Sequence, residues 1–140
     1  MDGRKAGEAR AKVGETEKLT INLGVVDVGQ IDLLVEEGFY SNRTDLIRTA
    51  IRNQLVVHAD ELKSTVARRT LVLGLQRFSR ADLERALASG RRLQIHVVGL
   101  ARIDDDVPPE LARATIESVE VLGAFHASPA VRDALAHCTR

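Results

Sequence analysis

Residues 17–55, EKLTINLGVVDVGQIDLLVEEGFYSNRTDLIRTAIRNQL, decide how the first half of this chain folds. The stretch opens with an alternating segment that sets Leu19, Ile21 and Leu23 against Lys18, Thr20 and Asn22. A period of two is typical of a β-strand with one buried and one polar face. No second strand pattern lies nearby, so the backbone groups of this strand lack a local partner. The simplest partner is the same strand from a second copy.

Two helical patterns follow the strand. Asp27-Val28-Gly29-Gln30 has the form of a capping box and predicts the start of the first helix, which is expected to stop at Gly38. After a turn at residues 39–41, Asn42-Arg43-Thr44-Asp45 predicts a second capping box. The second helix is expected to continue through His58 as far as residues 68–69. Apolar residues recur at helical spacing in both segments: Ile31, Leu34 and Val35, then Leu46, Ile47, Ala50, Ile51 and Leu55.

The order of strand, helix, turn and helix resembles the ribbon-helix-helix DNA-binding proteins. The run GFYSNRTDLIRTAIR (residues 38–52) is similar to the turn and second helix of CopG-, Arc- and ParD-like regulators. The resemblance implies a homodimer whose paired strands enter the major groove of double-stranded DNA, where Lys18, Thr20 and Asn22 contact base edges. It implies phosphate contacts from the start of the second helix, at Asn42 and Arg43. It also implies a dimer core, expected to contain Leu19, Ile21, Leu23, Ile31, Leu34, Leu46, Ile47, Ala50 and Ile51.

Composition limits the number of domains, the cellular compartment and the charge that can be expected of this chain. With 140 residues and 44% apolar content, the chain can form one ordinary domain or two small ones. A single cysteine fits a reducing compartment, and no apolar run indicates a signal peptide or a membrane span, so a cytoplasmic protein is expected. The chain has 20 basic and 20 acidic residues, so its net charge gives no attraction to DNA. A local patch doubled by dimer symmetry remains the expected source of affinity.

The second half of the chain has a repeating pattern. Gly74, Gly99 and Gly123 are nearly evenly spaced, and each is expected to end a β-like run and to be followed by a helix signal. The helix signals are Ser79-Arg80-Ala81-Asp82, Pro108-Pro109 and Ser128-Pro129. The overall prediction is an α/β (α+β) chain with a flexible tail over 1–16 and a ribbon-helix-helix module over 17–68. Residues 69–140 are expected to form a small repeat-like α/β domain, either a solenoid or a compact mixed sheet.

The expected function is a sequence-specific transcriptional regulator of the CopG type, acting most often as a repressor. Its C-terminal domain is expected to self-associate or to bind a protein partner, which would raise avidity on tandem sites. Two alternatives stay open. One is an antitoxin-like adaptor that holds a partner protein through residues 70–140, and the other is an architectural protein that coats DNA.

Chemistry beyond binding has little support in the sequence. The candidate metal ligands are scattered one to an element, and only two of them are adjacent: His58, His96, His126, His137 and Cys138. No spacing among them resembles a metal site on one helix or hairpin, so neither a metal sensor like the nickel-responsive repressor nor a cofactor is expected. No phosphate loop and no nucleophile motif is present, so an enzyme is not expected either.

Overall fold

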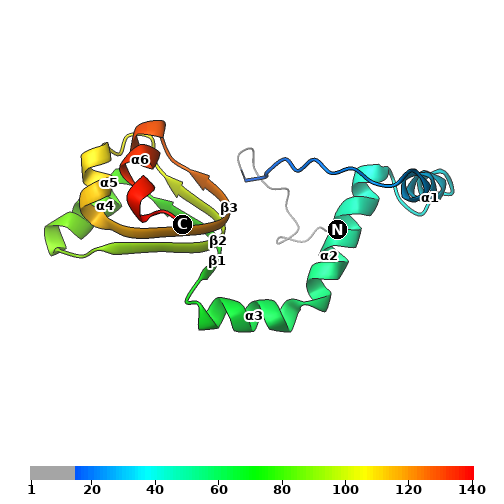
Figure 1. Ribbon diagram of the computed structural model, residues 1–140, viewed down its shortest axis with the longest axis horizontal. Coiled ribbons are helices and arrows are strands. Elements are labelled where there is room, and N and C mark those ends of the chain that lie inside the picture. Colours follow the sequence, from blue (N-terminus) through cyan, green and yellow to red (C-terminus); the bar gives the residue numbers. More distant parts are fainter. Residues whose placement is uncertain (1–14) are drawn as a thin grey trace, which may run out of the picture. The chain divides into compact units, whose positions relative to one another are not determined.

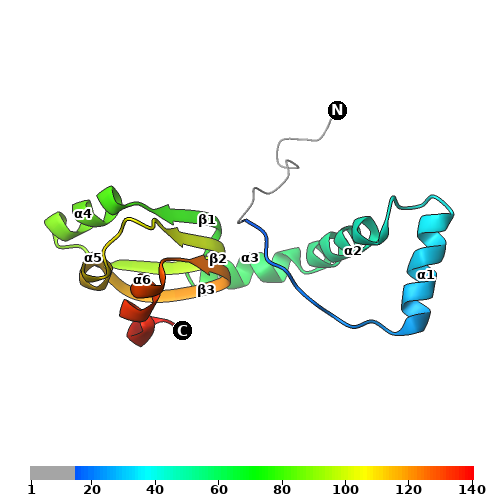
Figure 2. The ribbon, with the colours of Figure 1, turned by 90° about the horizontal axis from the view of Figure 1, so that it is seen from above.

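The computed structural model describes residues 15–140, so nearly all of the predicted tail lies outside the described residues. The chain forms two compact units, residues 18–65 and residues 66–140 with residues 15–17, referred to below as the N-terminal and C-terminal units. Figures 1 and 2 show the elements of each unit. None of the helices in the described chain combines the length and the apolar character that crossing a membrane requires.

The N-terminal unit begins with an unpaired segment. Residues 18–24 are not part of any regular element, and no strand of the described chain pairs with them. Helix α1 (Val25–Glu36) follows, with Gly24 as its N-cap. The predicted N-cap, Asp27, is wrong by three positions, because the N-cap is Gly24 and Val25 and Val26 already belong to the helix. Asp27 lies in the first turn instead, where its negative charge favours the helix N-terminus.

The turn between the first two helices follows from its glycine. Gly38 has φ +88°, a conformation that is unfavourable for residues with a side chain. The amide of Gly38 donates to the Val35 carbonyl at 3.1 Å and that of Phe39 to the Leu34 carbonyl at 3.0 Å, which together form a Schellman motif. The predicted stop of the first helix at Gly38 is therefore confirmed.

Helix α2 (Arg43–Val57) starts where the sequence predicted. Asn42 is its N-cap, and the Asn42 Oδ1 atom accepts from the Asp45 amide at 2.8 Å. The Asp45 carboxylate accepts from the Ser41 amide at 3.0 Å, one residue before the amide that a regular capping box would use.

The prediction that the second helix runs on to residue 68 is wrong. Helix α2 ends at Val57, His58 leaves helical geometry at φ −100° and ψ 16°, and helix α3 (Ala59–Arg68) begins directly afterwards. Two β-branched valines at the end of α2 weaken it. Asp60 and Glu61 in the first turn of α3 favour a new helix N-terminus at this point.

The C-terminal unit is a three-stranded parallel sheet with its helices together on one side (Figure 1). Strand order follows the sequence, and α5 packs between α4 and α6. All three predicted helix starts are confirmed, with Ser79 and Ser128 as side-chain caps. In chain order the elements are β1 (Val72–Phe78), α4 (Arg80–Ser89), β2 (Leu93–Ile103), α5 (Pro109–Thr115), β3 (Ile116–His126), α6 (Pro129–Ala134) and the short 3-10 helix η2 (Ala136–Cys138).

A single apolar core joins the sheet to these helices. Its fully buried members include Leu83 from α4, Ile95 and Val97 from β2, and Val131 from α6. Burial of side chains of this size stabilises the folded state by about 1.5–3 kcal/mol each. The predicted α/β class is confirmed for this unit.

The three repeated glycines do not end their strands, so that prediction is wrong. Gly74, Gly99 and Gly123 lie within β1, β2 and β3 and pair with one another in register across the sheet. Their φ angles are +132°, +137° and +122°. A Cβ atom on Gly99 would lie 2.1 Å from the Gly74 carbonyl oxygen, and one on Gly123 would lie 2.1 Å from the Gly99 oxygen. Strands β2 and β3 therefore continue past a point where the neighbouring backbone approaches too closely for any side chain.

Candidate nucleic-acid interface

Both faces of the segment before α1 are open to solvent. Lys18, Thr20 and Asn22 are exposed, as expected for side chains that could reach DNA. Their apolar neighbours are exposed as well, at 84% for Leu19, 68% for Ile21 and 42% for Leu23. A single copy of the chain therefore leaves the apolar side of this segment uncovered.

The helices of the N-terminal unit also lack a core of their own. None of α1, α2 or α3 contains a buried residue. Among the predicted dimer-core residues, Ile31, Leu46 and Ile47 are half-buried. The others on the helices remain exposed in a single copy: Leu34, Ala50 and Ile51. Apolar surface of this extent on a folded unit marks an interface.

The N-terminus of α2 is the predicted phosphate site. The backbone amides of Asn42 and Arg43 donate to no protein acceptor within residues 15–140. Such amides at a helix start carry partial positive charge and can bind an anion. Asn42 keeps this end of the helix in place through its cap to Asp45.

The side chain of Arg43 has a partner that the sequence did not reveal. Its Nε atom donates to Asp32 Oδ1 at 2.7 Å, and its Nη2 atom donates to Asp32 Oδ2 at 2.8 Å. The Arg43 guanidinium, chiefly through this hydrogen bonding, holds the pKa of the Asp32 carboxyl below its usual value. The ion pair joins α1 to α2 and leaves Nη1 and one N–H of Nη2 as the donors that it does not use.

Charge within this unit is not favourable for DNA overall. Residues 18–65 contain seven acidic and five basic residues. Arg48 and Arg52, on α2, are exposed. Any attraction to phosphate must therefore come from the local arrangement of donors and not from the net charge of the unit.

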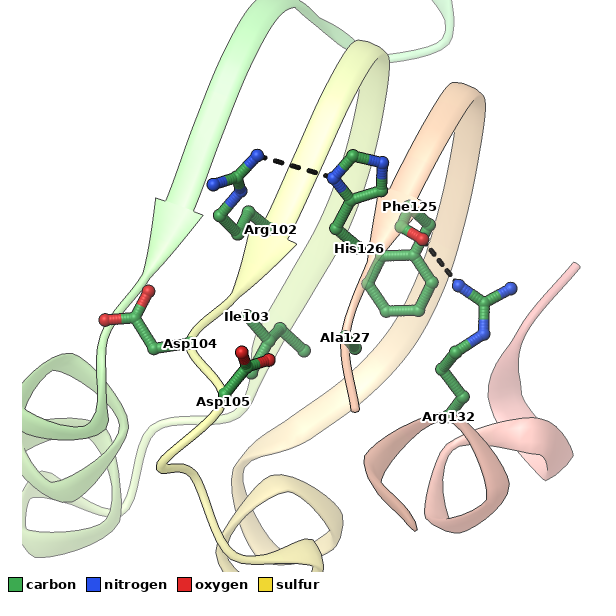
Figure 3. A pocket seen from close by; sticks show the side chains of 8 residues that line it. All are labelled: Arg102, Ile103, Asp104, Asp105, Phe125, His126, Ala127 and Arg132. Carbon is green, nitrogen blue, oxygen red and sulfur yellow. Dashed lines mark hydrogen bonds between the residues drawn. The ribbon is translucent and has the colours of Figure 1, made fainter. Parts of the chain in front are cut away.

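The C-terminal unit has a hollow of about 450 Å³ at the carboxyl ends of β2 and β3 (Figure 3). Arg102 and His126 point toward one another there, with Nη2 and Nδ1 3.4 Å apart, while Arg132 lies over the Phe125 ring at 5.4 Å. On its other side Asp104 receives a bidentate pair of bonds from Arg77, at 2.8 and 2.6 Å. Both signs of charge line the hollow, so its charges do not select one class of ligand: Arg102, Asp104, Asp105, His126 and Arg132.

The histidines and the cysteine do not form a metal site in the part of the chain that the structure describes. No three metal-ligating side chains come together among residues 15–140. His96 contacts Ser118 at 3.0 Å, and Cys138 donates to the Leu135 carbonyl at 3.4 Å.

Comparison with protein families gives one assignment that covers most of the chain. The model of the Ribbon-Helix-Helix transcriptional regulator family matches residues 14–132, so it includes the C-terminal unit as well as the segment 18–24 and its helices. Comparison with curated proteins and with solved structures gives no match. The match agrees with an extended segment followed by two helices, neither of which has a core within one copy. The chain belongs to the ribbon-helix-helix family of transcriptional regulators.

Proposed function

We propose that this protein is a homodimeric, sequence-specific DNA-binding repressor. The observation that carries the proposal is the unpaired segment 18–23, which has exposed apolar side chains on one side and exposed polar side chains on the other. Antiparallel pairing with the same segment of a second copy satisfies its backbone and covers Leu19, Ile21 and Leu23. The resulting ribbon has a width and polarity that suit the major groove.

The polar side of the ribbon would read the DNA sequence. Lys18 can donate to the guanine acceptors O6 and N7, and Asn22 can pair with adenine through one donor and one acceptor. Thr20, between them, can donate or accept. Two copies would present these three side chains twice, to two half-sites related by the dimer axis.

The start of α2 would fix the protein on the DNA backbone. The free amides of Asn42 and Arg43 suit a phosphate oxygen, and this contact carries no sequence information. The Arg43 side chain can add a charge-assisted contact only through donors that Asp32 leaves available. Because the unit is slightly acidic, non-specific affinity is expected to be modest.

Residues 66–140 would strengthen binding by linking copies of the protein. Their three parallel strands follow the order of the sequence, with β1 at one edge of the sheet and β3 at the other. Self-association through this unit would raise avidity on tandem operator sites. The unit already has a buried core, which disfavours an antitoxin segment that folds only on its partner.

The test is a selection from random duplex DNA at physiological salt, with the full chain and three variants. Wild type should enrich a motif with two-fold symmetry. Asn22→Ala should relax one position of each half-site at a cost of about 1–3 kcal/mol. Arg43→Ala should weaken all sequences nearly equally and reduce the salt slope by about one for each phosphate that the variant no longer neutralises.

Asp32→Asn is the matched control for Arg43→Ala. It removes the same ion pair but leaves the guanidinium in place, so an effect shared by both variants belongs to the α1–α2 link. A lower salt slope in Arg43→Ala alone assigns a phosphate to Arg43. The absence of any enriched motif for wild type would overturn the proposed function.

A further inference from the structure

The sheet of the C-terminal unit has one face that no helix covers. On β2 the residues that pack into the helix-side core are Ile95, Val97, Ala101 and Ile103. The residues between them must point to the opposite side, because neighbouring side chains of a strand alternate. The strand register extends this face to β1 and β3, so that it contains two apolar rows across the sheet: Leu73, Val98 and Leu122, then Leu75, Leu100 and Ala124.

This open face is strongly apolar and largely uncovered at its edges. Leu73 is 70% exposed and Leu75 53% exposed, whereas Leu100 on the central strand is buried. Parallel sheets in proteins almost always have both faces covered. A parallel sheet with helices on one side only therefore indicates that something packs on the other.

The pattern on this face is self-complementary about the glycine row. One step before the glycines the side chains are leucine, valine and leucine, and one step after them leucine, leucine and alanine. Consider a two-fold axis that runs along the glycine row, perpendicular to the strands. It places the apolar row before the glycines of one copy over the apolar row after the glycines of the other copy. On β3 the axis sets Leu122 of one copy over Ala124 of the other, a large side chain against a small one.

The polar ends of the face are compatible with the same symmetry. Three steps before the glycine row, Glu120 is ion-paired with Arg69, and three steps after it Arg77 is ion-paired with Asp104. Arg102, also three steps after, lies 3.4 Å from His126 and acts electrostatically on the Asp104 carboxylate. His126 in turn lies 4.0 Å from the Glu17 carboxylate. The two-fold arrangement sets the Glu120 carboxylate of one copy over the His126 imidazole of the other, so β3 does not oppose like charge with like charge.

We propose that the open face of the C-terminal sheet is covered by the same face of a second copy of this chain. The two sheets stack face to face, and their helices form the two outer layers. The inference rests on the proposed function in one respect, since pairing of the N-terminal units would hold a second face nearby at high effective concentration.

The first experiment measures whether the face is covered in the full chain. In a Cys138→Ser background, cysteine replaces Leu75 on the open face or Leu87 on α4, two leucines that are 53% and 52% exposed in one copy. Labelling with a small maleimide should be at least about tenfold slower for Leu75→Cys than for Leu87→Cys. Equal rates would overturn the proposal.

The second experiment identifies what covers the face. Leu75→Glu and Leu122→Glu place a charge on the open face without entering the helix-side core, and Leu87→Glu is the control. Both face variants should lower the sedimentation coefficient of the full chain, because the assembly either loses a copy or becomes less compact. The control variant should leave the sedimentation coefficient unchanged. Slow labelling at position 75 with no change in sedimentation for either face variant would show a cover other than a second copy.

These outcomes are separate from those of the DNA selection. If position 75 is labelled slowly and the chain enriches no DNA motif, the covered sheet face is supported and the DNA-binding proposal is overturned. If position 75 is labelled fast and the chain enriches a two-fold motif, the DNA-binding proposal is supported and the covered face is overturned.

Discussion

The two units of this protein differ in what one copy of the chain can bury. The C-terminal unit has a core of fully buried side chains, among them Leu83, Ile95 and Val131, enclosed by its own sheet and helices. The N-terminal unit has helices of similar regularity but no buried residue in any of them. Good caps and helical spacing therefore specify local structure in both units, while only one obtains its apolar burial from within the chain. The other depends on association.

The largest expected effect tests that dependence directly. Ile21→Asp places a carboxylate on the side of segment 18–23 that pairing would bury, at a cost of about 3–5 kcal/mol for each unpaired buried charge. Analytical ultracentrifugation with circular dichroism should show that the N-terminal helices unfold, while the C-terminal unit stays folded. Thr20→Asp, on the polar side, should leave association intact and weaken DNA binding. If the N-terminal helices of Ile21→Asp stay folded as those of Thr20→Asp do, the apolar side is not the interface.

A smaller effect should be confined to the C-terminal unit. Gly99→Ala combines strain at φ +137° with a Cβ only 2.1 Å from the Gly74 oxygen, and should lower the free energy of unfolding by about 3 kcal/mol or more. Gly74→Ala has the same strain at φ +132° but no atom within 4 Å of its Cβ, so about 1–3 kcal/mol is expected. Urea unfolding of both variants measures the difference. Equal decreases would mean that close approach of the strands adds nothing to the strain.

The smallest effects concern one ion pair in each unit. Arg43 lowers the pKa of Asp32, and Arg77 lowers that of Asp104, in both cases chiefly through side-chain hydrogen bonds. Each pair therefore contributes stability at neutral pH that declines as the pH falls below about 4 and through the lower folded-state pKa. Asp32→Asn and Asp104→Asn should each flatten the acid limb of their own unit in urea titrations. Asp105→Asn is the control. An unchanged acid limb in Asp32→Asn or Asp104→Asn would show that the ion pair of that residue does not contribute to the pH dependence of stability.

The features that the sequence predicts well are those that depend on neighbouring residues. The helix starts at Asn42, Ser79 and Ser128 follow from caps that bond within a few positions. The stop at Gly38 is local in the same sense. Family membership also follows from one ordered stretch, and the family match confirms it.

The features that the sequence does not reveal depend on contacts between distant residues. Nothing near Arg43 indicates that Asp32, eleven positions earlier, will be its partner. Gly99 is predicted to end a strand because glycine usually interrupts one, whereas its role is set by a carbonyl from β1. The break at His58 is hidden in the sequence by apolar spacing that continues across it, although two valines before it and Asp60 and Glu61 after it favour a break. The roles assigned to Lys18, Thr20 and Asn22 stay predictions until DNA binding is measured.

The glycine row also bears on how the sheet forms. Parallel strands lose the entropy of closing long loops before the contacts between the strands can stabilise them. A misaligned pair of strands could therefore persist as a kinetic trap. In this sheet a shift of one residue would place Val98 or Leu100 where the Gly74 carbonyl leaves room for a hydrogen atom only. The same exclusion operates between β2 and β3 at Gly123. Steric rejection of misaligned pairs thus favours the correct register, which is selected by two residues without side chains, Gly99 and Gly123.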